Sequence, residues 1–421
     1  MKGASEEPLC LVPAANAFRY SSGTRNLSLV SRGLLTVSSS PTSRAGGRSC
    51  EGVIGSREPS TRAAVGVNGL PLVALLAIFL AAAVAVWVSG IKLSGATDVL
   101  DTRLGLGEAF GGLILLAIVT NLPEIAIVAS AALAHDLGIA VGNILGGIAI
   151  QTVVLVVLDA VGLPGDVALS YRGASLVVLL EAATVVAVLT VTVMGSQLPS
   201  NLLWWRIDPA ALLIAVVWVA GLALVDRARK GLPWHEEGQP PDGQQHPRGH
   251  SKRTTERRAS DRGVSTARAG IVFAVGAGVT LAGGVLLERS GQGIASHFHM
   301  SGVLFGSTVL AAATALPEVS TGLASVRMGD YQLAFGDIFG GNAFLPVLFL
   351  MASLLSGQTV VPQAHVTDIY LTGLGALLSV VYVFGIVFRP SRTIGRVGVD
   401  SAVVLLLYLI GIAGLVAIAT S

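Results

Sequence analysis

The chain has 421 residues, of which 52% are hydrophobic and only 12% are charged, and its formal net charge is +2. With a mean hydropathy of +0.74, it has too few charged side chains to cover a water-soluble protein of this length. This composition excludes a soluble enzyme or a nucleic-acid-binding domain and fits a protein embedded in the lipid bilayer.

Residues 1–66 differ from the rest of the chain. They are rich in Ser, Arg and Gly and contain no apolar run of signal-peptide length. This composition predicts a disordered tail. Its arginines conflict with the outer position that the charges of the loops assign to it. Either the tail is disordered and crosses the membrane poorly, or translation starts nearer Val67, and we favour the second.

About ten apolar runs follow, and each is long enough to cross about 30 Å of hydrocarbon as a helix. They are much longer than barrel strands and lack alternating polar residues. The sequence therefore predicts an all-α, polytopic membrane protein. The expected spans are 68–90, 105–134, 137–163, 168–194, 208–226, 269–288, 300–326, 331–356, 366–388 and 399–420.

Positive charges gather in alternate loops. One set of loops holds only Arg206 and Arg289, whereas the other set holds Lys92, Arg103, Arg172, the basic residues of 227–268, Arg327, Arg389, Arg392 and Arg396. Short cytoplasmic loops carry the excess of Lys and Arg. We therefore expect a multi-pass protein of the cell membrane, with its central loop in the cytoplasm and both termini outside. Because each half then crosses the membrane five times, an odd number, a second half similar to the first must be inserted in the opposite orientation.

An internal repeat supports this inversion. Thr120, Leu122, Pro123 and Glu124 recur at an offset of 194 (318 − 124), which places the second glutamate at Glu318. Between 120–151 and its copy, 11 of 32 positions are identical without a gap. Such inverted repeats are typical of secondary transporters, whose substrate sites lie where interrupted helices of the two halves meet. The expected organisation is a tail 1–66, a first five-helix repeat 67–228 with its motif at 117–151, a cytoplasmic linker 229–268, and a second five-helix repeat 269–421 with its motif at 311–345.

The two glutamates are the central candidates for chemistry. Each lies well inside an apolar run, where a charge costs at least about 2.5–3.5 kcal/mol. A divalent cation held between Glu124 and Glu318 would offset that cost, and protons or two monovalent ions could replace it. Pro123 and Pro317 interrupt their helices and leave backbone oxygens unpaired.

Further oxygen donors surround these motifs. Thr120 and Thr314 lie one turn before the glutamates on the same helical face. Carboxylate, carbonyl and hydroxyl oxygens together suit Ca²⁺, which takes six to eight ligands. Two glycine-rich segments let helices pack closely and carry four more polar candidates: Asn143, Gln151, Asp337 and Asn342.

The paired Thr-x-Leu-Pro-Glu motifs, each followed by a Gly-Asn or Gly-Asp and then Gly-Gly, resemble the two alpha repeats of the calcium/cation antiporter superfamily, especially its sodium/calcium exchanger family. The resemblance implies four ion sites, with Glu124 and Glu318 shared by calcium and sodium. It also implies flanking roles for Thr120 and Thr314, and for the main-chain oxygens of Ala117 and Ala311.

Several positions depart from the family pattern. The serine that usually precedes Leu-Pro-Glu is Asn121 in one repeat and Ala315 in the other, and an acidic or amide position near the motif end reads Gln151 and then Leu345. These changes remove oxygens expected to hold sodium and leave the two-glutamate centre intact. The family resemblance predicts an antiporter that exchanges Ca²⁺ for Na⁺. The loss of these oxygens makes a Ca²⁺/H⁺ antiporter the alternative.

Other interpretations remain open in the sequence. Glu124 and Glu318 could be buried structural residues, and the threonines could bond only to their own helices. A membrane enzyme is disfavoured because no zinc pair, nucleophile elbow or phosphate loop is present. A channel would not require two inverted carboxylate motifs. We expect inorganic cations and the bilayer as partners, no cofactor and no nucleic acid, while the oligomeric state stays open.

Overall fold

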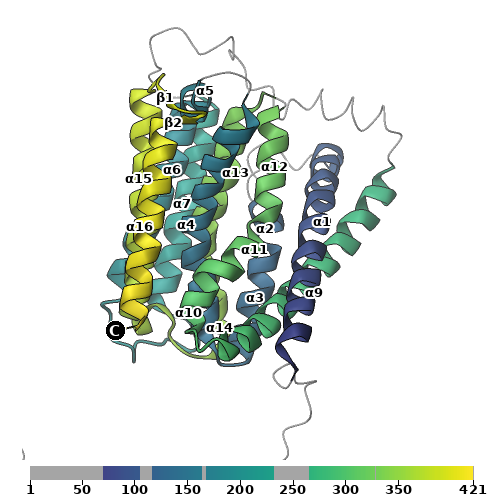
Figure 1. Cartoon of the computed structure of the whole chain (residues 1–421), viewed down its shortest axis with the longest axis vertical. Coiled ribbons are helices and arrows are strands. Elements are labelled where there is room, and N and C mark those ends of the chain that lie inside the picture. The colour runs from purple at the N-terminus through teal and green to yellow at the C-terminus, as the bar shows by residue number, and fades with distance from the viewer. Residues whose placement is uncertain (1–69, 105–115, 164–166, 232–264, 328, 421) are drawn as a thin grey trace, which may run out of the picture. The chain divides into compact units, whose positions relative to one another are not determined.

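The computed structural model describes residues 70–104, 116–163, 167–231, 265–327 and 329–420. These residues are almost entirely helical (Figure 1). Eight helical segments are long and apolar enough to cross a membrane. They are α1 (Leu72–Leu104), α4 (Leu137–Gly162), α6 (Leu176–Gly195), α7 (Pro209–Arg229), α9 (Thr266–His297), α13 with η5 and α14 (Tyr331–Phe344, Leu345–Val347 and Leu348–Ser356), α15 (Val366–Phe388) and α16 (Val399–Thr420).

Two further apolar segments are interrupted at the proline motifs, and among the described residues the second of them is long enough to count as a ninth span. One contains α2 (Leu116–Thr120) and α3 (Leu122–Leu133). The other contains α10, η4, α11 and α12, and its two parts meet at a bend of 42°. The bounds of these four elements are Gly302–Phe305, Gly306–Leu310, Ala311–Thr314 and Leu316–Arg327. The expected polytopic helical fold is thus confirmed, and the predicted breaks lie at Asn121 and Ala315.

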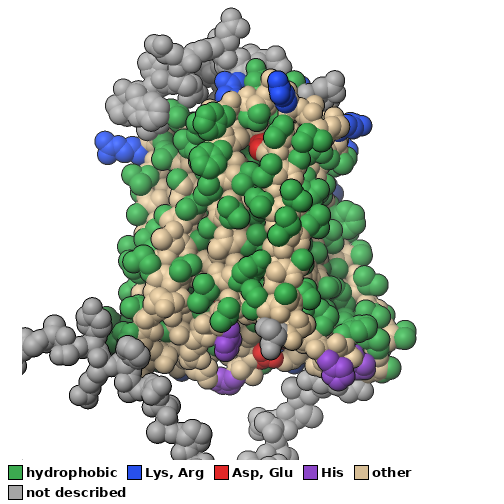
Figure 2. All heavy atoms as spheres, turned by 60° about the vertical axis from the view of Figure 1, so that its left-hand side comes forward, with side chains coloured by type: hydrophobic (Ala, Val, Ile, Leu, Met, Phe, Trp, Pro, Cys, Tyr) green, Lys and Arg blue, Asp and Glu red, His purple; other side chains and the backbone are tan. Residues whose placement is uncertain are grey.

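The helices sort into central and peripheral ones by burial. In the most apolar part of α4, 72% of the residues are buried, compared with 17% in α16. A helix that is apolar on all sides but mostly exposed requires lipid around it. Figure 2 shows the corresponding surface, on which hydrophobic side chains cover the middle of the molecule.

Charged side chains mark the two ends of the bundle. Lys and Arg gather at the top of Figure 2 and His side chains at the bottom. We call the first the basic end, which includes α5 (Leu169–Gly173) and the hairpin of β1 (Thr393–Ile394) and β2 (Val397–Gly398) (Figure 1). The opposite end is called the histidine end.

The internal repeat is visible in the backbone and in helix packing. His135 and Gly329, at the repeat offset of 194, both have positive φ, 57° and 77°. Gly90 of α1 packs on Pro317, and Gly284 of α9 packs on Pro123, again at the same offset. Each interrupted helix is therefore covered by the first helix of the other half, and α1 and α9 lie side by side (Figure 1).

Helix α4 makes the closest backbone contacts of this core with α10, through Gly142, and with η4, through Gly146. A Cβ atom at Gly142 would lie 2.6 Å from the Val303 carbonyl oxygen, and one at Gly146 would lie 2.2 Å from the Ser307 Cα. Only glycine permits this approach. The π-helical turn η4, which lies at this contact, is a feature common near functional sites that hydropathy alone does not predict.

Several predicted boundaries were wrong. Helix α1 continues to Leu104 instead of ending at 90, and α9 continues to His297 instead of ending at 288. The hairpin β1–β2 was not predicted. The tail 1–66, the N-terminal third of the second span and most of the linker 229–268 lie outside the described residues, so their boundaries stay predictions.

Candidate cation-binding site

Glu124 and Glu318 occupy the same position in the two repeats. Each lies in the first turn of the helix that follows the break, α3 or α12. The N-terminal end of a helix carries unpaired N–H groups and partial positive charge, which favour a carboxylate there. The side chains are 0% and 2% exposed. The local sequence therefore places two carboxylates inside the protein.

The two carboxylates lie close to each other. Glu318 is near enough to Glu124 and Asp337 for their charges to repel one another, and the Thr314 side chain lies beside Glu124. Among the described residues, no group donates a hydrogen bond of normal geometry to the four glutamate oxygens. Buried carboxylates without donors require a cation or a proton. These four residues were predicted from the sequence and are brought together.

Polar side chains of the first repeat approach α13 next to this cluster. A Cβ atom at Gly341 would lie 3.3 Å from Nδ2 of Asn121 and 3.5 Å from Oε1 of Gln151. Gly341 and Asp337 are one turn apart and share a face of α13. Asn121 and Gln151 therefore extend the polar surface that begins at Asp337.

The remaining amide candidates have different surroundings. Nδ2 of Asn342 donates to the Thr152 hydroxyl at 3.1 Å, which ties α13 to α4. Asn143, the repeat counterpart of Asp337, is fully buried, and neither of its side-chain polar atoms has a hydrogen-bond partner in the described part of the chain. Gly306 of η4 packs against the Asn143 backbone. Asn143 thus retains the capacity to bind a ligand, whereas Asn342 is partly used for packing.

The threonines and main-chain oxygens flank the break. The Thr314 hydroxyl donates to the Ala311 carbonyl at 3.3 Å, and the Ala315 N–H donates to the same oxygen at 3.0 Å. A hydroxyl that donates to its own helix still offers its oxygen to a cation. The Ala311 oxygen would have to exchange a hydrogen bond for an ion. In the first repeat, Thr120 contacts Asn121 at 3.4 Å, and Ala117 lies in α2.

Two hydroxyl groups near the candidate site were not predicted from the sequence. The Thr321 hydroxyl donates to Oδ2 of Asp337 at 2.8 Å and so orients that carboxylate from α12. Thr152 holds Asn342 as described above. Thr321 lies three residues after Glu318, so helical spacing could have indicated it. The equivalent position of the first repeat is Ile127, which has no hydroxyl, so the repeat does not point to Thr321.

Two other buried glutamates have partners of their own. Glu181 of α6 pairs with Arg229 of α7 at 3.0 Å. Oε2 of Glu288 accepts a hydrogen bond from Ser130 at 2.8 Å, which ties α9 to α3. Because Ser130 donates a hydrogen bond to Glu288 inside the bundle, this charge does not have to lie at the end of a membrane span. Helix α9 can therefore continue past the predicted end. These side chains have structural partners that Glu124 and Glu318 lack.

A family model decides the classification of this fold and site. The model for the sodium/calcium exchanger protein matches residues 74–225 and 269–417, which include both motifs and most of the chain. The chain belongs to the sodium/calcium exchanger protein family. Members of this family are membrane transporters, and the expected superfamily is confirmed.

Curated relatives agree with the family assignment. The putative antiporter CaxA of Alkalimonas amylolytica is 28% identical over 274 residues, which cover 65% of this chain and 77% of that protein. The inner membrane protein YrbG of Escherichia coli strain K12 is 26% identical over 310 residues, covering 72% of this chain and 87% of that protein.

Solved structures of two kinds of exchanger share the fold. The sodium-calcium exchanger NCX_Mj, soaked with 10 mM Na⁺ and zero Ca²⁺, matches with a TM-score of 0.53 and 17% identity over 82% of this chain and 99% of that chain. The H⁺/Ca²⁺ exchanger CAX matches with a TM-score of 0.57 and 12% identity over 82% and 86% of the two chains. These likenesses establish the fold and leave the counter-ion of this family member undetermined.

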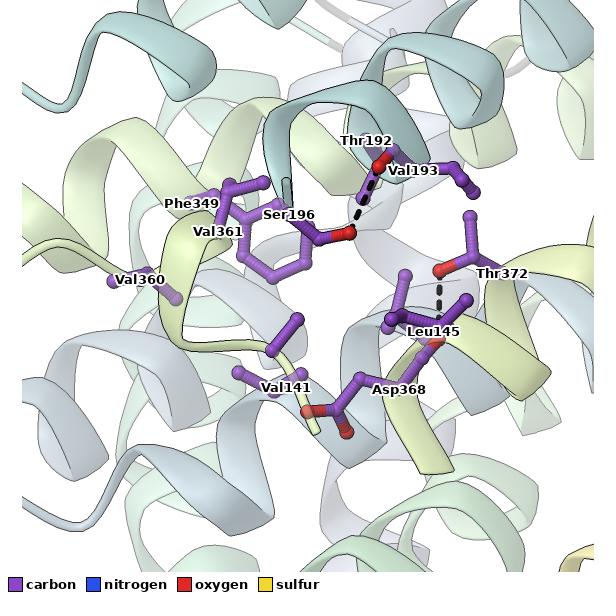
Figure 3. Close-up of a pocket in the computed structure, with 12 residues that line it drawn as sticks. Val141, Leu145, Thr192, Val193, Ser196, Phe349, Val360, Val361, Asp368 and Thr372 are labelled. Carbon is purple, nitrogen blue, oxygen red and sulfur yellow. Dashed lines mark hydrogen bonds between the residues drawn. The ribbon is translucent and has the colours of Figure 1, made fainter. Parts of the chain in front are cut away.

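A pocket away from the glutamates is shown in Figure 3. It lies between α4, α6, α15 and the short helix η6 (Val361–Gln363), and apolar side chains such as Val141 and Phe349 form most of its lining. Oδ2 of Asp368, at its edge, accepts the His365 N–H at 2.8 Å and caps α15. Neither Glu124 nor Glu318 lines it. The pocket is therefore separate from the candidate cation site.

Proposed function

We propose that the protein is a secondary active antiporter that exchanges Ca²⁺ for Na⁺ across the membrane by alternating access. The observation that carries this proposal is the pair of buried glutamates, Glu124 and Glu318, which lie near each other at equivalent positions of the two repeats. Among the described residues their oxygens accept no hydrogen bond of normal geometry. A single divalent cation neutralises both charges, and the oxygen-rich surroundings suit a hard ion.

Exchange, as opposed to simple flux, follows from the cost of the vacant site. Two unneutralised carboxylates in the membrane interior destabilise the protein by several kcal/mol. The transition between the inward-open and outward-open conformations is therefore disfavoured while the site is vacant. The transition becomes possible when Ca²⁺, two monovalent cations or protons fill the site. Coupled countertransport is the kinetic consequence.

Sodium and proton coupling place different demands on the same residues. Sodium needs further oxygens, which Thr120, Thr314, Asn121, Gln151 and Asp337 can supply. Asn143 and Asn342 are further candidates, as are the main-chain oxygens of Ala117 and Ala311. A proton needs only a carboxylate, and the proximity of Glu318 to two other acidic side chains favours a Ca²⁺/H⁺ antiporter as the second candidate.

Transport in proteoliposomes tests the function and the counter-ion. We expect Ca²⁺ uptake under an imposed outward Na⁺ gradient at equal pH, and none without a gradient. Uptake driven by an outward proton gradient and not by Na⁺ would replace Na⁺ with H⁺. If an imposed Ca²⁺ gradient drove Ca²⁺ uptake in the absence of any counter-ion gradient, the protein would be a channel. If no gradient drove uptake, calcium would not be the substrate.

The orientation in the membrane is also a proposal. Short loops rich in Arg favour the cytoplasm, so we place the basic end, including the β1–β2 hairpin, inside the cell and the C-terminus outside. After replacement of Cys10 and Cys50, a single cysteine at Gly395 should react with an impermeant maleimide only in inverted vesicles. A single cysteine at Asn201, at the other end of the bundle, should react only in intact cells. The opposite labelling pattern would reverse the topology.

A further inference from the structure

A second pair of buried carboxylates lies at the basic end. Asp159 is in the last turn of α4 and Asp400 in the first turn of α16, and they are 2% and 5% exposed. A Cβ atom at Gly398 would lie 2.7 Å from Oδ1 of Asp400 and 3.1 Å from Oδ2 of Asp159. Glycine at this position lets both carboxylates converge on one point.

The two aspartates differ in how their oxygens are used. Oδ1 of Asp159 accepts the Leu169 N–H at 2.8 Å, and Oδ2 accepts the Gly398 N–H at 2.7 Å. Asp159 thus fastens α5 and the hairpin to α4. Both oxygens of Asp400 are buried, and in the described part of the chain neither has a hydrogen-bond partner. Neither aspartate forms an ion pair with a described Lys or Arg.

Two hydroxyls complete an oxygen-lined site. The Tyr382 hydroxyl of α15 and the Ser401 hydroxyl of α16 are 3.1 Å apart. The Ser401 side chain also lies beside Asp159, and Asp400 is close enough to Asp159 for their charges to interact. Gly385 of α15 leaves the space that Oδ2 of Asp400 occupies. Carboxylate and hydroxyl oxygens from three helices therefore surround one location.

The corresponding junction in the other half is built around a single carboxylate. There α14 ends near α7, and the counterpart of Asp159 at the repeat offset is Ser353. Asp208 alone caps α7: it accepts the Ala210 N–H at 2.9 Å and the Val360 and Val361 N–H groups at 3.1 Å each. One satisfied carboxylate builds that junction, whereas Asp400 adds an unsatisfied one.

We propose that Asp159 and Asp400, with the hydroxyls of Ser401 and Tyr382, form a second cation site. We expect this site to bind a divalent ion, namely Ca²⁺. Buried carboxylates are stabilised by a cation that they share, and an all-oxygen donor set is the one that hard divalent ions prefer. The bound ion would hold α4, α15, α16 and the hairpin together at the basic end. This site is separate from Glu124 and Glu318 and does not depend on their transport role.

Equilibrium binding of Ca²⁺ to the purified full chain tests the proposal. We expect the double variant Glu124→Gln/Glu318→Gln to retain one bound Ca²⁺ per chain. Adding Asp400→Asn should weaken that remaining binding at least tenfold, whereas adding Asp208→Asn should not. No Ca²⁺ bound to the double variant would overturn the proposal and indicate a proton shared by the aspartates. Binding that survives Asp400→Asn would overturn it by placing the ion elsewhere.

Asp400→Asn in the otherwise unchanged chain provides a second test if the double variant does not fold. We expect it to lower the number of bound Ca²⁺ ions per chain by one, while gel filtration and thermal unfolding report on its folding. An unchanged number in folded protein would contradict the second site. Because these measurements count bound ions, their outcome is independent of whether the transport assays support Ca²⁺ exchange.

Discussion

Glu318→Gln and Glu124→Gln should each abolish gradient-driven Ca²⁺ uptake in proteoliposomes. Each substitution keeps the size of the side chain and removes one of the two charges that neutralise the ion. Loss of one partner from a buried charge set costs about 3–5 kcal/mol, which corresponds to a loss of about 100-fold or more in cation affinity. Initial uptake rates at equal amounts of reconstituted protein measure the effect.

The same variants should show the opposite effect on stability without Ca²⁺. In the wild type, Glu318 is repelled by Glu124 and Asp337, and a glutamine at either glutamate position removes part of this repulsion. We therefore expect a higher unfolding temperature for the variants in Ca²⁺-free detergent and a smaller increase on adding Ca²⁺. Lower stability in both conditions would indicate that the glutamates are structural.

Glu288→Gln is the matched control for these variants. Glu288 is also a buried glutamate in a membrane-length helix, but its carboxylate already has a donor in Ser130. A glutamine can keep that hydrogen bond. We expect uptake within about twofold of the wild type, because the hydrogen bond to Ser130 is kept and Glu288 lies outside the candidate cation site. Equal losses of Ca²⁺ uptake in all three variants would contradict a specific role of Glu124 and Glu318 in transport.

The fold and the centre of the candidate site could be predicted from the sequence because both depend on local signals. Apolar runs identify helices wherever lipid surrounds them, and proline followed by a buried glutamate marks the breaks at Asn121 and Ala315. The offset of 194 then relates the two halves without any structural information. Glu124, Glu318 and Thr314 were found in this way, and Asp337 was found in the glycine-rich segment that follows the second motif. The structure brings these four residues together.

Features that depend on packing between distant segments were not predictable. The predicted span of α9 ended at Glu288 because two charged residues, Glu288 and Arg289, follow each other there. The sequence does not show that Ser130 donates a hydrogen bond to Glu288 inside the bundle. Helix α1 was ended too early because polar residues such as Lys92 lower the hydropathy of its last turns, although the helix continues. Likewise, no local pattern relates Asp159 to Asp400, which meet only because α16 packs on α4.

The glycines of the repeats allow a test of the packing with an internal control. Gly146 and Gly340 are equivalent at the repeat offset, and both lie in helices that contribute to the site region. A Cβ at Gly146 would lie 2.2 Å from the Ser307 Cα of η4, whereas a Cβ at Gly340 would meet no atom within 4 Å. The same substitution should therefore have opposite effects at the two positions.

Gly146→Ala should destabilise the protein strongly and lower transport, because the methyl group meets backbone that cannot rotate away. Overpacking of this kind costs about 1–3 kcal/mol or more, and it would separate α4, which carries Asn143 and Gln151, from the π-helical turn. Gly340→Ala should leave stability unchanged or raise it by up to about 1 kcal/mol, because alanine favours helix. Thermal unfolding and uptake rates of the two variants measure both effects. Equal stability of the two variants would show that η4 does not pack on α4 in this way, since only that contact distinguishes the two equivalent glycines.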